Sequence, residues 1–481
     1  MSRGFGFILA FCAVADAGAA DGVVGPGNCD EAGFTSVLAT VDGSGGGTIT
    51  FDCGDATFAF TSYKSIQNDV TIDGATHVTF DGGDSSAFFS IAAGANVTLQ
   101  HLTLQHGAFA GVHALENLGH LRLWDTRVIL TTSTESAVFN YGRMDVLSST
   151  FGGNASDGAG GAISNVNPSQ GSGSVLVVAY SAFEENTSAS SGGAIYSDAS
   201  FVYLTGVTLS SNQATDGGAV DAFGGGLYVL ASSFTDNHAT AGSGGAIRLR
   251  ENTLDLSRSN IVFNTAATNG GGVSCEVDAL IQTDIYATTF ADNTANGNGG
   301  GAYSECDSTY AEVTFNANAA NGDGGAIVEA GTGAASVDFA TLNANTAASG
   351  GGLFADGGGV IAIGHSIVSA NTGGNCAGTL TSNGYNLSDD AGCAAAFTAA
   401  GDVLDASLPL MELGDYGGGA LTEPPASDSA AIDHIPPEAC NPVPPGDARG
   451  AMRPIGAGCD SGAVELGGVI DEIFASSLES G

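Results

Sequence analysis

The sequence predicts an all-β protein, a single-stranded, right-handed parallel β-helix, and two observations lead to this fold class. First, a unit of about 27 residues recurs between residues 151 and 371. Second, hydrophobic residues alternate over short runs within each unit, as at residues 201–204, which is the period of a strand and not of a helix. Such a unit cannot bury its inner face alone, so copies should stack as coils with parallel strands. Roughly twelve coils are expected, and the rule for parallel crossovers predicts the right-handed form.

The first signature of the unit is an aromatic or aliphatic residue, two variable residues and an Asn, as at residues 183–186. Stacking should bring the Phe positions into an internal row. It should also align the Asn side chains as a ladder in a turn, where Asn tolerates a left-handed backbone. The expected ladder consists of Asn154, Asn186, Asn212, Asn237, Asn264, Asn293, Asn318, Asn345 and Asn371.

The second signature is a Gly pair followed by a small and a hydrophobic residue, as at residues 192–195. We expect this pair at a corner that needs a positive φ and a close approach of the next coil, because a Cβ permits neither easily. The second glycines of the pairs are Gly161, Gly193, Gly218, Gly245, Gly271, Gly301, Gly325 and Gly351.

The N-terminal part divides into a leader and a cap. Residues 1–20 are typical of a signal peptide, with Arg3 before an apolar run and small residues at 17–19. Residues 21–47 form the predicted cap, with a helix over 30–41 that starts at Asp30 and has an apolar face of Phe34, Val37, Leu38 and Val41. Such a helix would cover the open end of a β-helix that spans residues 48–373. We expect no transmembrane segment in the mature chain.

Cysteine usage suits an oxidising compartment. Removal of residues 1–20 takes away Cys12 and leaves eight cysteines. Zinc is the alternative, but no Cys-x-x-Cys spacing occurs. Pairing of cysteines adjacent in the sequence would join Cys29 to Cys53, Cys275 to Cys306, Cys376 to Cys393, and Cys440 to Cys459.

The formal net charge of −41, with only ten Lys and Arg residues, disfavours binding to nucleic acids and to anionic membranes. It would also repel acidic polysaccharides unless a divalent cation intervenes. No cofactor is expected. Loosely bound calcium is compatible with acidic residues near the turns, although they recur at no fixed offset: Asp198, Asp216, Asp221, Asp292 and Asp323.

One charged group in the repeats could carry chemistry. Alternation places Arg248 and Arg250 on one face of a strand, and alignment on the Gly corner puts Arg248 beside Asp221 and Arg250 beside Glu276. Such a quartet could bind sugar carboxylates in an enzyme, or it could be a cross-strand ladder of ion pairs. The histidines at 101, 106, 113 and 120 could line one side of the early coils, or they could be scattered surface residues.

The pairing of Gly-Gly-Ala with Phe-x-x-Asn resembles the polymorphic outer membrane protein repeats of bacterial surface proteins. Matching copies of Phe-x-x-Asn lie at 151–154, 183–186, 234–237, 290–293 and 315–318. The resemblance implies a pectin-lyase-like solenoid at a bacterial cell surface.

The region 374–466 resembles the choice-of-anchor Q domain that closes many bacterial surface β-helix proteins. The motifs that carry the resemblance, in order, are residues 383–387, 413–418, 429–433, 447–450, 453–454 and 459–465. We expect a disulfide-containing C-terminal cap here, with Arg449 and Arg453 as ion-pair partners of carboxylates such as Asp447 or Asp460. The tail, 467–481, resembles a short terminal sorting motif or is a disordered end.

These observations predict an exported bacterial protein, extracellular or outer membrane-associated, that acts as a structural or adhesive rod without catalysis. Its expected partners are carbohydrate or protein on a cell surface, and not nucleic acid. The alternative is a carbohydrate-active enzyme, a polysaccharide lyase or a glycoside hydrolase, that uses a groove on the flank of the β-helix.

Overall fold

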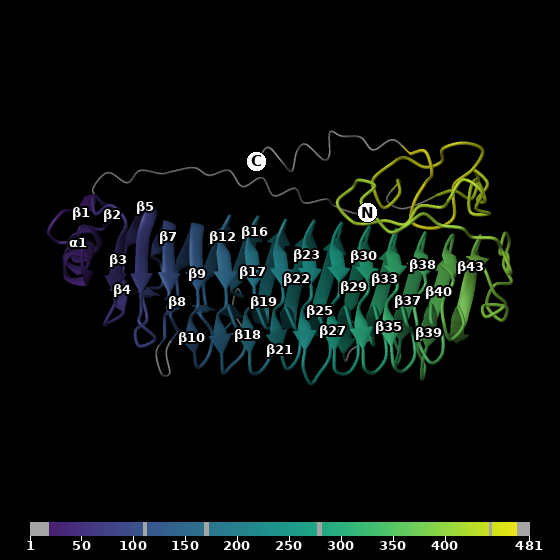
Figure 1. Ribbon diagram of the computed structural model, residues 1–481, viewed down its shortest axis with the longest axis horizontal. Helices are drawn as coiled ribbons and strands as arrows, with labels where there is room; N and C mark the ends of the chain where they lie inside the picture. The colour runs from purple at the N-terminus through teal and green to yellow at the C-terminus, as the bar shows by residue number, and fades with distance from the viewer. Residues whose placement is uncertain (1–18, 109–112, 168–172, 277–280, 442–444, 469–481) are drawn as a thin grey trace.

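A computed structural model of the chain describes residues 19–108, 113–167, 173–276, 281–441 and 445–468. The predicted signal peptide lies outside the described residues except for its last two positions, and so does nearly all of the predicted tail. The described chain forms a right-handed parallel β-solenoid of about 13 turns, close to the roughly twelve expected (Figure 1). No helix in these ranges is long and apolar enough to span a membrane.

Each coil has three flanks, because three short strands alternate inward apolar with outward polar residues and bend sharply between them. Flank A follows the Gly pair. Its strands are β4 (Lys64–Ile66), β6 (Phe89–Ile91), β8 (Leu115–Asn117), β11 (Val138–Asn140), β15 (Ile163–Val166), the first parts of β19 (Ile195–Thr205), β22 (Val220–Leu230) and β25 (Ile247–Ser257), then β28 (Val273–Glu276), β32 (Ala302–Ser304), β36 (Ile327–Glu329), β39 (Leu353–Ala355) and β42 (Cys376–Gly378).

Flank B comes next in every coil, and all its strands pair in parallel. It starts at β2 (Gly46–Phe51), which also pairs with β1 (Gly22–Val24). It continues through the first parts of β5 (Asp69–Asp81), β7 (Asn96–Gln105) and β9 (His120–Ile129), through β12 (Arg143–Leu147), β16 (Val175–Ala179) and the second parts of β19, β22 and β25, and through β29 (Gln282–Tyr286), β33 (Asp307–Ala311), β37 (Ala334–Asp338), β40 (Val360–Gly364) and β43 (Leu380–Gly384).

Flank C carries the Phe positions. Its strands are β3 (Ala56–Ala59), the second parts of β5, β7 and β9, then β13 (Thr150–Gly152), β17 (Ala182–Glu184), β20 (Thr208–Ser210), β23 (Ser233–Thr235), β26 (Asn260–Val262), β30 (Thr289–Ala291), β34 (Thr314–Asn316), β38 (Thr341–Asn343), β41 (Ile367–Ser369) and β44 (Leu387–Ser388). The rings of Phe151 and Phe183 stack inside the solenoid with centroids 4.7 Å apart.

A separate eight-stranded sheet of two-residue strands follows the Asn positions and precedes the Gly corner. We call it the short sheet. It consists of β10 (Thr132–Ser133), β14 (Ala155–Ser156), β18 (Thr187–Ser188), β21 (Gln213–Ala214), β24 (His238–Ala239), β27 (Thr265–Ala266), β31 (Thr294–Ala295) and β35 (Ala319–Ala320).

The nine asparagines form a continuous buried ladder. The Asn186 Nδ2 donates to the Asn212 Oδ1 at 3.0 Å and to the Phe151 carbonyl at 3.0 Å, and the backbone N–H of Asn186 donates to the same Asn212 oxygen. This arrangement repeats from coil to coil down to Asn371, whose Nδ2 donates to the Asn375 Oδ1 at 2.9 Å. Each amide therefore satisfies buried backbone groups of two neighbouring coils.

The backbone of this turn corrects one expectation. The positive φ falls on the residue before each Asn, such as Glu185 with φ 55°, and not on the Asn itself. The bend must occur one residue earlier, because the Asn side chain has to face inward toward its neighbour. The residues in this position are Gly153, Glu185, Ser211, Asp236, Phe263, Asp292, Ala317, Ala344 and Ala370.

The two members of a Gly pair have different roles at the corner. The first member has a positive φ, 65° at Gly192 and 68° at Gly244. The second member lies against the next coil, where a Cβ on Gly245 would come 2.1 Å from the Gly271 carbonyl oxygen. The corner thus needs both properties that glycine provides.

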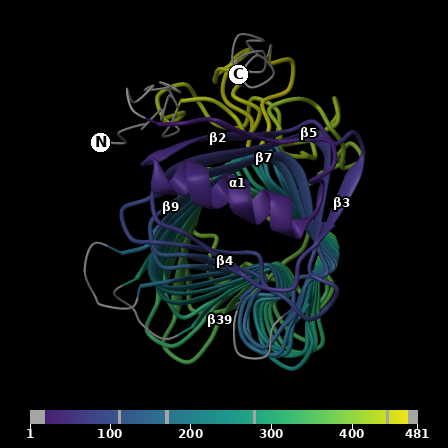
Figure 2. The ribbon, with the colours of Figure 1, turned by 90° about the vertical axis from the view of Figure 1, so that its left-hand side faces the viewer.

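Helix α1 (Glu31–Gly43) lies across the N-terminal end of the solenoid (Figure 2). The Asp30 carboxylate accepts from the Gly33 N–H at 2.8 Å and caps the helix. Phe34, Leu38 and Val41 are buried against the first coils. A disulfide from Cys29 to Cys53 fastens the start of the helix to the chain after β2. The helix therefore covers apolar surface that stacking leaves open.

At the other end, β42, β43 and β44 form a further coil, so strand pairing continues to Ser388, beyond the boundary at 373 that the repeats indicate. Cys393 and Phe397 then pack into the end of the core, and a disulfide joins Cys393 to Cys376. The rest of the C-terminal region turns back and lies along the last third of the rod (Figure 1).

Candidate functional sites on the flanks

The predicted charged quartet comes together on flank A. Arg248 of β25 is the register partner of Asp221 in β22, and Arg250 is the register partner of Glu276 in β28. The strands β22, β25 and β28 belong to three successive coils, and their outward residues share one surface. Sequence alignment on the Gly corner therefore placed all four residues in the positions that the structure gives them.

The closest ion pairs do not follow the register, although the Arg248 Nη1 also lies 3.7 Å from the Oδ2 of its register partner Asp221. The Arg250 Nη2 lies 3.0 Å from the Asp221 Oδ1, and the Arg248 Nη2 lies 2.9 Å from the Glu276 Oε2. The Arg248 Nη1 also lies 2.9 Å from the Asp216 Oδ2. Asp216 is thus a fifth member that sequence reasoning did not assign to this site, although it directly precedes a Gly pair.

Burial decides what this group can do chemically. Asp221 is fully buried, and burial raises its pKa while the Arg250 and Arg248 guanidiniums oppose that effect. Burial also lowers the pKa of Arg250, but Asp221, Tyr196 and Asp216 together outweigh this effect and the net direction is upward. The net direction of the Asp221 pKa is upward, but this carboxylate has no solvent contact, so a substrate cannot reach it to transfer a proton. The ion pairs of this group connect side chains of three successive coils and hold these coils together.

The other predicted candidates lie apart from one another. His101 and His106 contact Asp73 and Asp81, at 3.0 and 3.2 Å. His113 packs on the ring of Phe139, and the His120 Nε2 lies 2.8 Å from the Asp145 Oδ2. Within the ranges that the structure describes, no three His, Cys, Asp or Glu side chains form a group that could hold a metal ion.

The cysteines form four disulfides: Cys29–Cys53, Cys275–Cys306, Cys376–Cys393 and Cys440–Cys459. These are the pairs that are adjacent in the sequence. The Cys275–Cys306 bridge lies in the core of the solenoid and connects flank A of one coil to the chain that leaves flank A in the next.

The two C-terminal arginines have different partners. Arg449 pairs with Asp447 at 2.7 Å, one of the carboxylates expected from the sequence. Arg453 pairs with Glu312 at 2.9 Å and Glu465 at 3.3 Å, and it contacts only the backbone carbonyl of Asp460. Local sequence could not indicate Glu312, because it lies on the solenoid 141 residues earlier.

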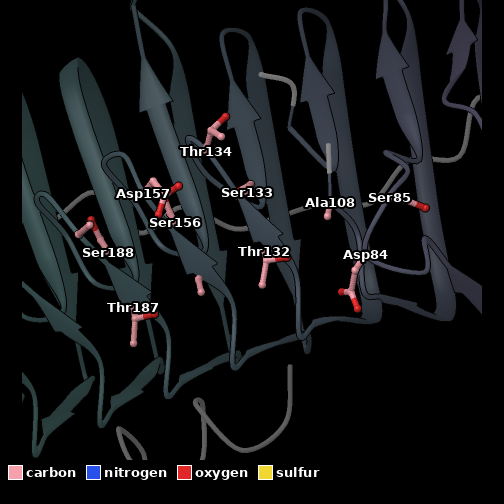
Figure 3. A pocket seen from close by; sticks show the side chains of 12 residues that line it. Asp84, Ser85, Ala108, Thr132, Ser133, Thr134, Ser156, Asp157, Thr187 and Ser188 are labelled. Carbon is pink, nitrogen blue, oxygen red and sulfur yellow. The ribbon is translucent and has the colours of Figure 1, made fainter. Parts of the chain in front are cut away.

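A groove of about 820 Å³ lies over the first strands of the short sheet (Figure 3). Its floor is formed by β10, β14 and β18, and its lining also includes Asp84, Ala108 and Asp157. In the view of Figure 3, Thr132 and Ser133 lie between the two carboxylates. Sequence reasoning missed this groove, since its only signal is the small hydroxyl residue that follows several of the ladder asparagines.

The groove is lined by hydroxyls and carboxylates. Seven of its lining residues are Ser or Thr, two are Asp and three are Ala, so the part of the lining that the structure describes contains no cation and no aromatic ring. Hydroxyls both donate and accept hydrogen bonds, and carboxylates accept them. This composition suits a neutral ligand with many hydroxyl groups, and it provides no positive charge that would stabilise an oxyanion.

Comparison with known proteins supports the identification of the repeat. Residues 181–198 match the Chlamydia polymorphic membrane protein (Chlamydia_PMP) repeat. The match includes the Asn of the ladder at 186 and the Gly pair at 192–193, so the chain carries repeats of this type. A search of curated proteins found no match.

One solved structure is similar in architecture, a mannuronic acid specific polysaccharide family 6 lyase from human gut microbiota. The two chains are 10% identical, with a TM-score of 0.34, and the similarity covers 64% of this chain and 82% of the lyase chain.

The likeness of the C-terminal region 374–466 to the choice-of-anchor Q domain stays a prediction.

Proposed function

We propose that the protein is a non-catalytic β-helix at a bacterial cell surface, exported and outer membrane-associated, that serves as a structural and adhesive rod. The observation that carries this proposal is the charged group of flank A. Its arginines are engaged by carboxylates of neighbouring coils, and Asp221 is fully buried among them. Charges placed in this way hold coils together and are not available to a substrate.

Three further observations support the location. The repeat type is that of a polymorphic membrane protein, and the four disulfides suit an oxidising compartment. The strongly acidic composition keeps a long stack of strands soluble and protects it from edge-to-edge association. Calcium would bind loosely, if present, and the rod requires no cofactor.

The adhesive part of the proposal assigns carbohydrate to the groove over the short sheet. A row of hydroxyls that follows successive coils can form hydrogen bonds with successive sugar units of a neutral glycan. Protein ligands on a cell surface are the other expected partners of the rod.

An activity screen tests the choice between rod and enzyme. The folded chain without residues 1–20 is incubated with uronate-containing and neutral polysaccharides, with and without calcium, and unsaturated products and reducing ends are measured. We expect no turnover. Cleavage that disappears in Arg248→Ala or Arg250→Ala would overturn the proposal and place an active site with Asp221, Arg248, Arg250 and Glu276 on flank A.

Retention on immobilised neutral glycans tests the groove. Ala189→Trp fills the groove from its exposed rim, whereas Ala241→Trp adds the same side chain at an exposed position outside it. We expect Ala189→Trp to lose retention and Ala241→Trp to keep it. Equal retention by the two variants would remove the groove from the proposal.

A further inference from the structure

One stretch of flank B is apolar on a chain that is otherwise strongly acidic. The strands β16, β19 and β22 of three successive coils carry no charged residue on flank B, although the whole chain has 51 Asp and Glu residues. Side chains alternate along a strand, so every second residue points outward. We call the outward apolar residues of these strands the Tyr228 face: Val175, Val177, Phe201, Tyr203, Tyr228 and Leu230.

Three aromatic rings of the Tyr228 face lie together. Tyr203 and Tyr228 are register partners, and their rings stack with centroids 4.8 Å apart and planes 8° from parallel. The ring of Tyr228 leans along its own strand over Gly226, where an added Cβ would lie 2.8 Å from the Tyr228 Cε2 and 3.2 Å from the Phe201 Cδ1. The glycine therefore leaves the space that these rings share.

The Tyr228 face is open to solvent. Phe201 and Leu230 are each 39% exposed, and Tyr203 and Tyr228 are half-buried. The hydrogen bonds that hold the C-terminal region to the solenoid begin at Asn260, beyond β22, so the described part of that region leaves this face uncovered (Figure 1). Contiguous apolar surface of this kind is typical of a site that binds a partner.

Uncompensated negative charge borders the Tyr228 face on one side. Asp255 of β25 is the register partner of Tyr228, and Asp284 of β29 is the register partner of Asp255. Both carboxylates are exposed. Asp284 accepts from the Gln282 Nε2 at 3.0 Å, whereas the Asp255 carboxylate has no hydrogen bond or ion pair within the described ranges. Like charges directly opposite each other destabilise a sheet, so a cation from outside would relieve this pair.

The pKa of Asp255 agrees with this picture. Partial burial and the neighbouring Asp284 carboxylate both raise it above the ordinary value. On the other side of the face, Arg143 is the register partner of Val175, and its charge is balanced because it pairs with Asp145 at 2.8 Å. The charge that a partner can neutralise therefore lies at Asp255 and Asp284.

This combination of rings and carboxylates selects a basic partner. Arg and Lys side chains lie favourably on aromatic faces and form ion pairs with carboxylates. A protein segment supplies apolar side chains beside its basic ones, and an apolar centre with a polar rim is the usual anatomy of a protein interface. A sugar needs several hydrogen-bonding groups around its ring, which Val, Phe and Leu side chains do not offer. A second copy would bring the same carboxylates to a two-fold contact, where they would repel each other.

We propose that the Tyr228 face is the docking surface for a basic segment of a partner protein, whose Arg or Lys side chains lie on Tyr228 and pair with Asp255 and Asp284. The apolar side chains of that segment pack on the rest of the face. This inference rests on the proposed adhesive function, and it gives the chemistry of the protein partner that this function leaves open.

Peptide binding tests the chemistry of the partner. The full chain without residues 1–20 is titrated into three dye-labelled, capped peptides of equal length, in which Leu alternates with Arg, with Gln or with Glu, and fluorescence anisotropy is measured. We expect saturable binding of the Arg peptide that added salt weakens, weaker binding of the Gln peptide and none of the Glu peptide. Equal binding of the Arg and Gln peptides would overturn the proposal.

Ring variants separate docking from the general attraction of an acidic chain for a cation. Tyr228→Ala leaves the net charge unchanged and should weaken binding of the Arg peptide about tenfold or more, whereas Tyr228→Phe keeps the ring and should bind normally. Tyr63→Ala is the matched control, because Tyr63 is 56% exposed and lies outside the face. Circular dichroism and the urea midpoint verify each fold. Unchanged affinity in Tyr228→Ala, or an equal loss in Tyr63→Ala, refutes the site.

A pair of charge variants tests the border. Asp255→Asn should weaken binding of the Arg peptide about threefold, in the range of an exposed ion pair. Asp356→Asn removes an exposed carboxylate in a later coil, before β40, and changes the net charge by the same amount. An equal effect of the two substitutions would show that the peptide senses only the overall charge, and this would contradict the proposal.

Other occupants give different results. A dimer in analytical ultracentrifugation that Tyr228→Ala abolishes would assign the face to a second copy, and displacement of the peptide by neutral oligosaccharides would assign it to a glycan; either result overturns the proposal. Failure is separable from that of the proposed function. Retention on neutral glycans without peptide binding removes only this inference, whereas cleavage of a polysaccharide would end the non-catalytic account and leave the Tyr228 variants to decide the docking site.

Discussion

The guanidinium of Arg453 lies 2.9 Å from the carboxylate of Glu312, with both side chains buried at the contact between the C-terminal region and the solenoid. Arg453 also donates to the carbonyls of Asp460 and Gly462 and packs over the ring of Phe339. Burial raises the pKa of Glu312 well above its ordinary value, and Arg453 opposes this effect. One side chain thus orders the returning segment itself and links it to two successive coils of the solenoid.

Arg453→Leu should destabilise this contact, because it leaves the carboxyls of Glu312 and Glu465 buried without their cation. We expect a loss of about 3–5 kcal/mol, measured by urea denaturation, together with faster proteolysis of residues 389–468. Arg143→Leu is the control, since 46% of that side chain is exposed. Equal midpoints for the parent chain and Arg453→Leu would contradict this role.

Asn237→Ala should interrupt the ladder in its middle. The Asn237 amide donates to the Asn264 Oδ1 and the Leu209 carbonyl, and its oxygen accepts from the backbone and side chain of Asn212. Several buried groups would lose their partner, so we expect a cost of about 3 kcal/mol in a urea titration. Asn321→Ala removes an exposed amide–amide contact and should change stability by less than about 0.5 kcal/mol. A similar cost for both would show that burial of the ladder does not matter.

Gly245→Ala should be poorly tolerated, since the new Cβ would meet the Gly271 carbonyl oxygen at 2.1 Å and backbone cannot move aside cheaply. A loss of about 3 kcal/mol is expected from thermal or urea unfolding. Gly43→Ala is the matched control, because that glycine ends α1 with no atom within 4 Å of the added Cβ. There the substitution should be neutral or slightly stabilising.

Glu329→Gln should change how stability depends on pH. Glu329 faces the solenoid interior, its pKa is raised by burial to about 9 from 4.5, and neither carboxyl oxygen has a hydrogen-bond partner among the described residues. Below pH 4.5 the carboxyl is protonated in both states and the stabilisation from its raised pKa is fully present. As pH rises toward 9 only the unfolded state releases its proton, so this stabilisation is lost.

Glutamine cannot titrate, so the variant should gain stability relative to the parent by about 1.4 kcal/mol per pH unit, or about 4 kcal/mol between pH 5 and pH 8. Urea midpoints at these two pH values measure the gain, and other titrating groups cancel in the comparison. Parallel pH profiles for parent and variant would show that Glu329 is already ionised in the folded chain.

Strict periodicity made the Asn ladder, the positions of Arg248 and Asp221 and all but one of the expected Gly corners predictable, because identical offsets in neighbouring units must stack. In the run of three glycines at 299–301 the corner pair is Gly299 and Gly300, so the expected second member Gly301 is one residue too late. The ion pairs were not predictable in the same way. Arg248 is long enough to reach Asp216 and Glu276 as well as its own register partner, so side-chain length and burial decide the pairing.

Two features have no periodic signal. Asn117, Asn140 and Asn165 form a second buried ladder on flank A, with Nδ2 to Oδ1 distances of 2.7 Å, but the coils around them differ in length. The contact of Arg453 with Glu312 joins a segment without repeats to the side of the rod. Neither composition nor spacing contains information about which coil such a segment will meet.

The path of the returning segment gives the two halves of the rod different mechanical properties. Asn260 bonds to Gly419 and Leu421, Thr289 to Leu421, and Asn316 and Asn343 to the Glu423 carboxylate. The short segment 419–423 therefore forms hydrogen bonds with four successive coils, whereas each earlier coil contacts mainly its two neighbouring coils. Under tension the coils before Asn260 would unfold one at a time. The coils that the segment 419–423 connects would withstand a higher force and then unfold together.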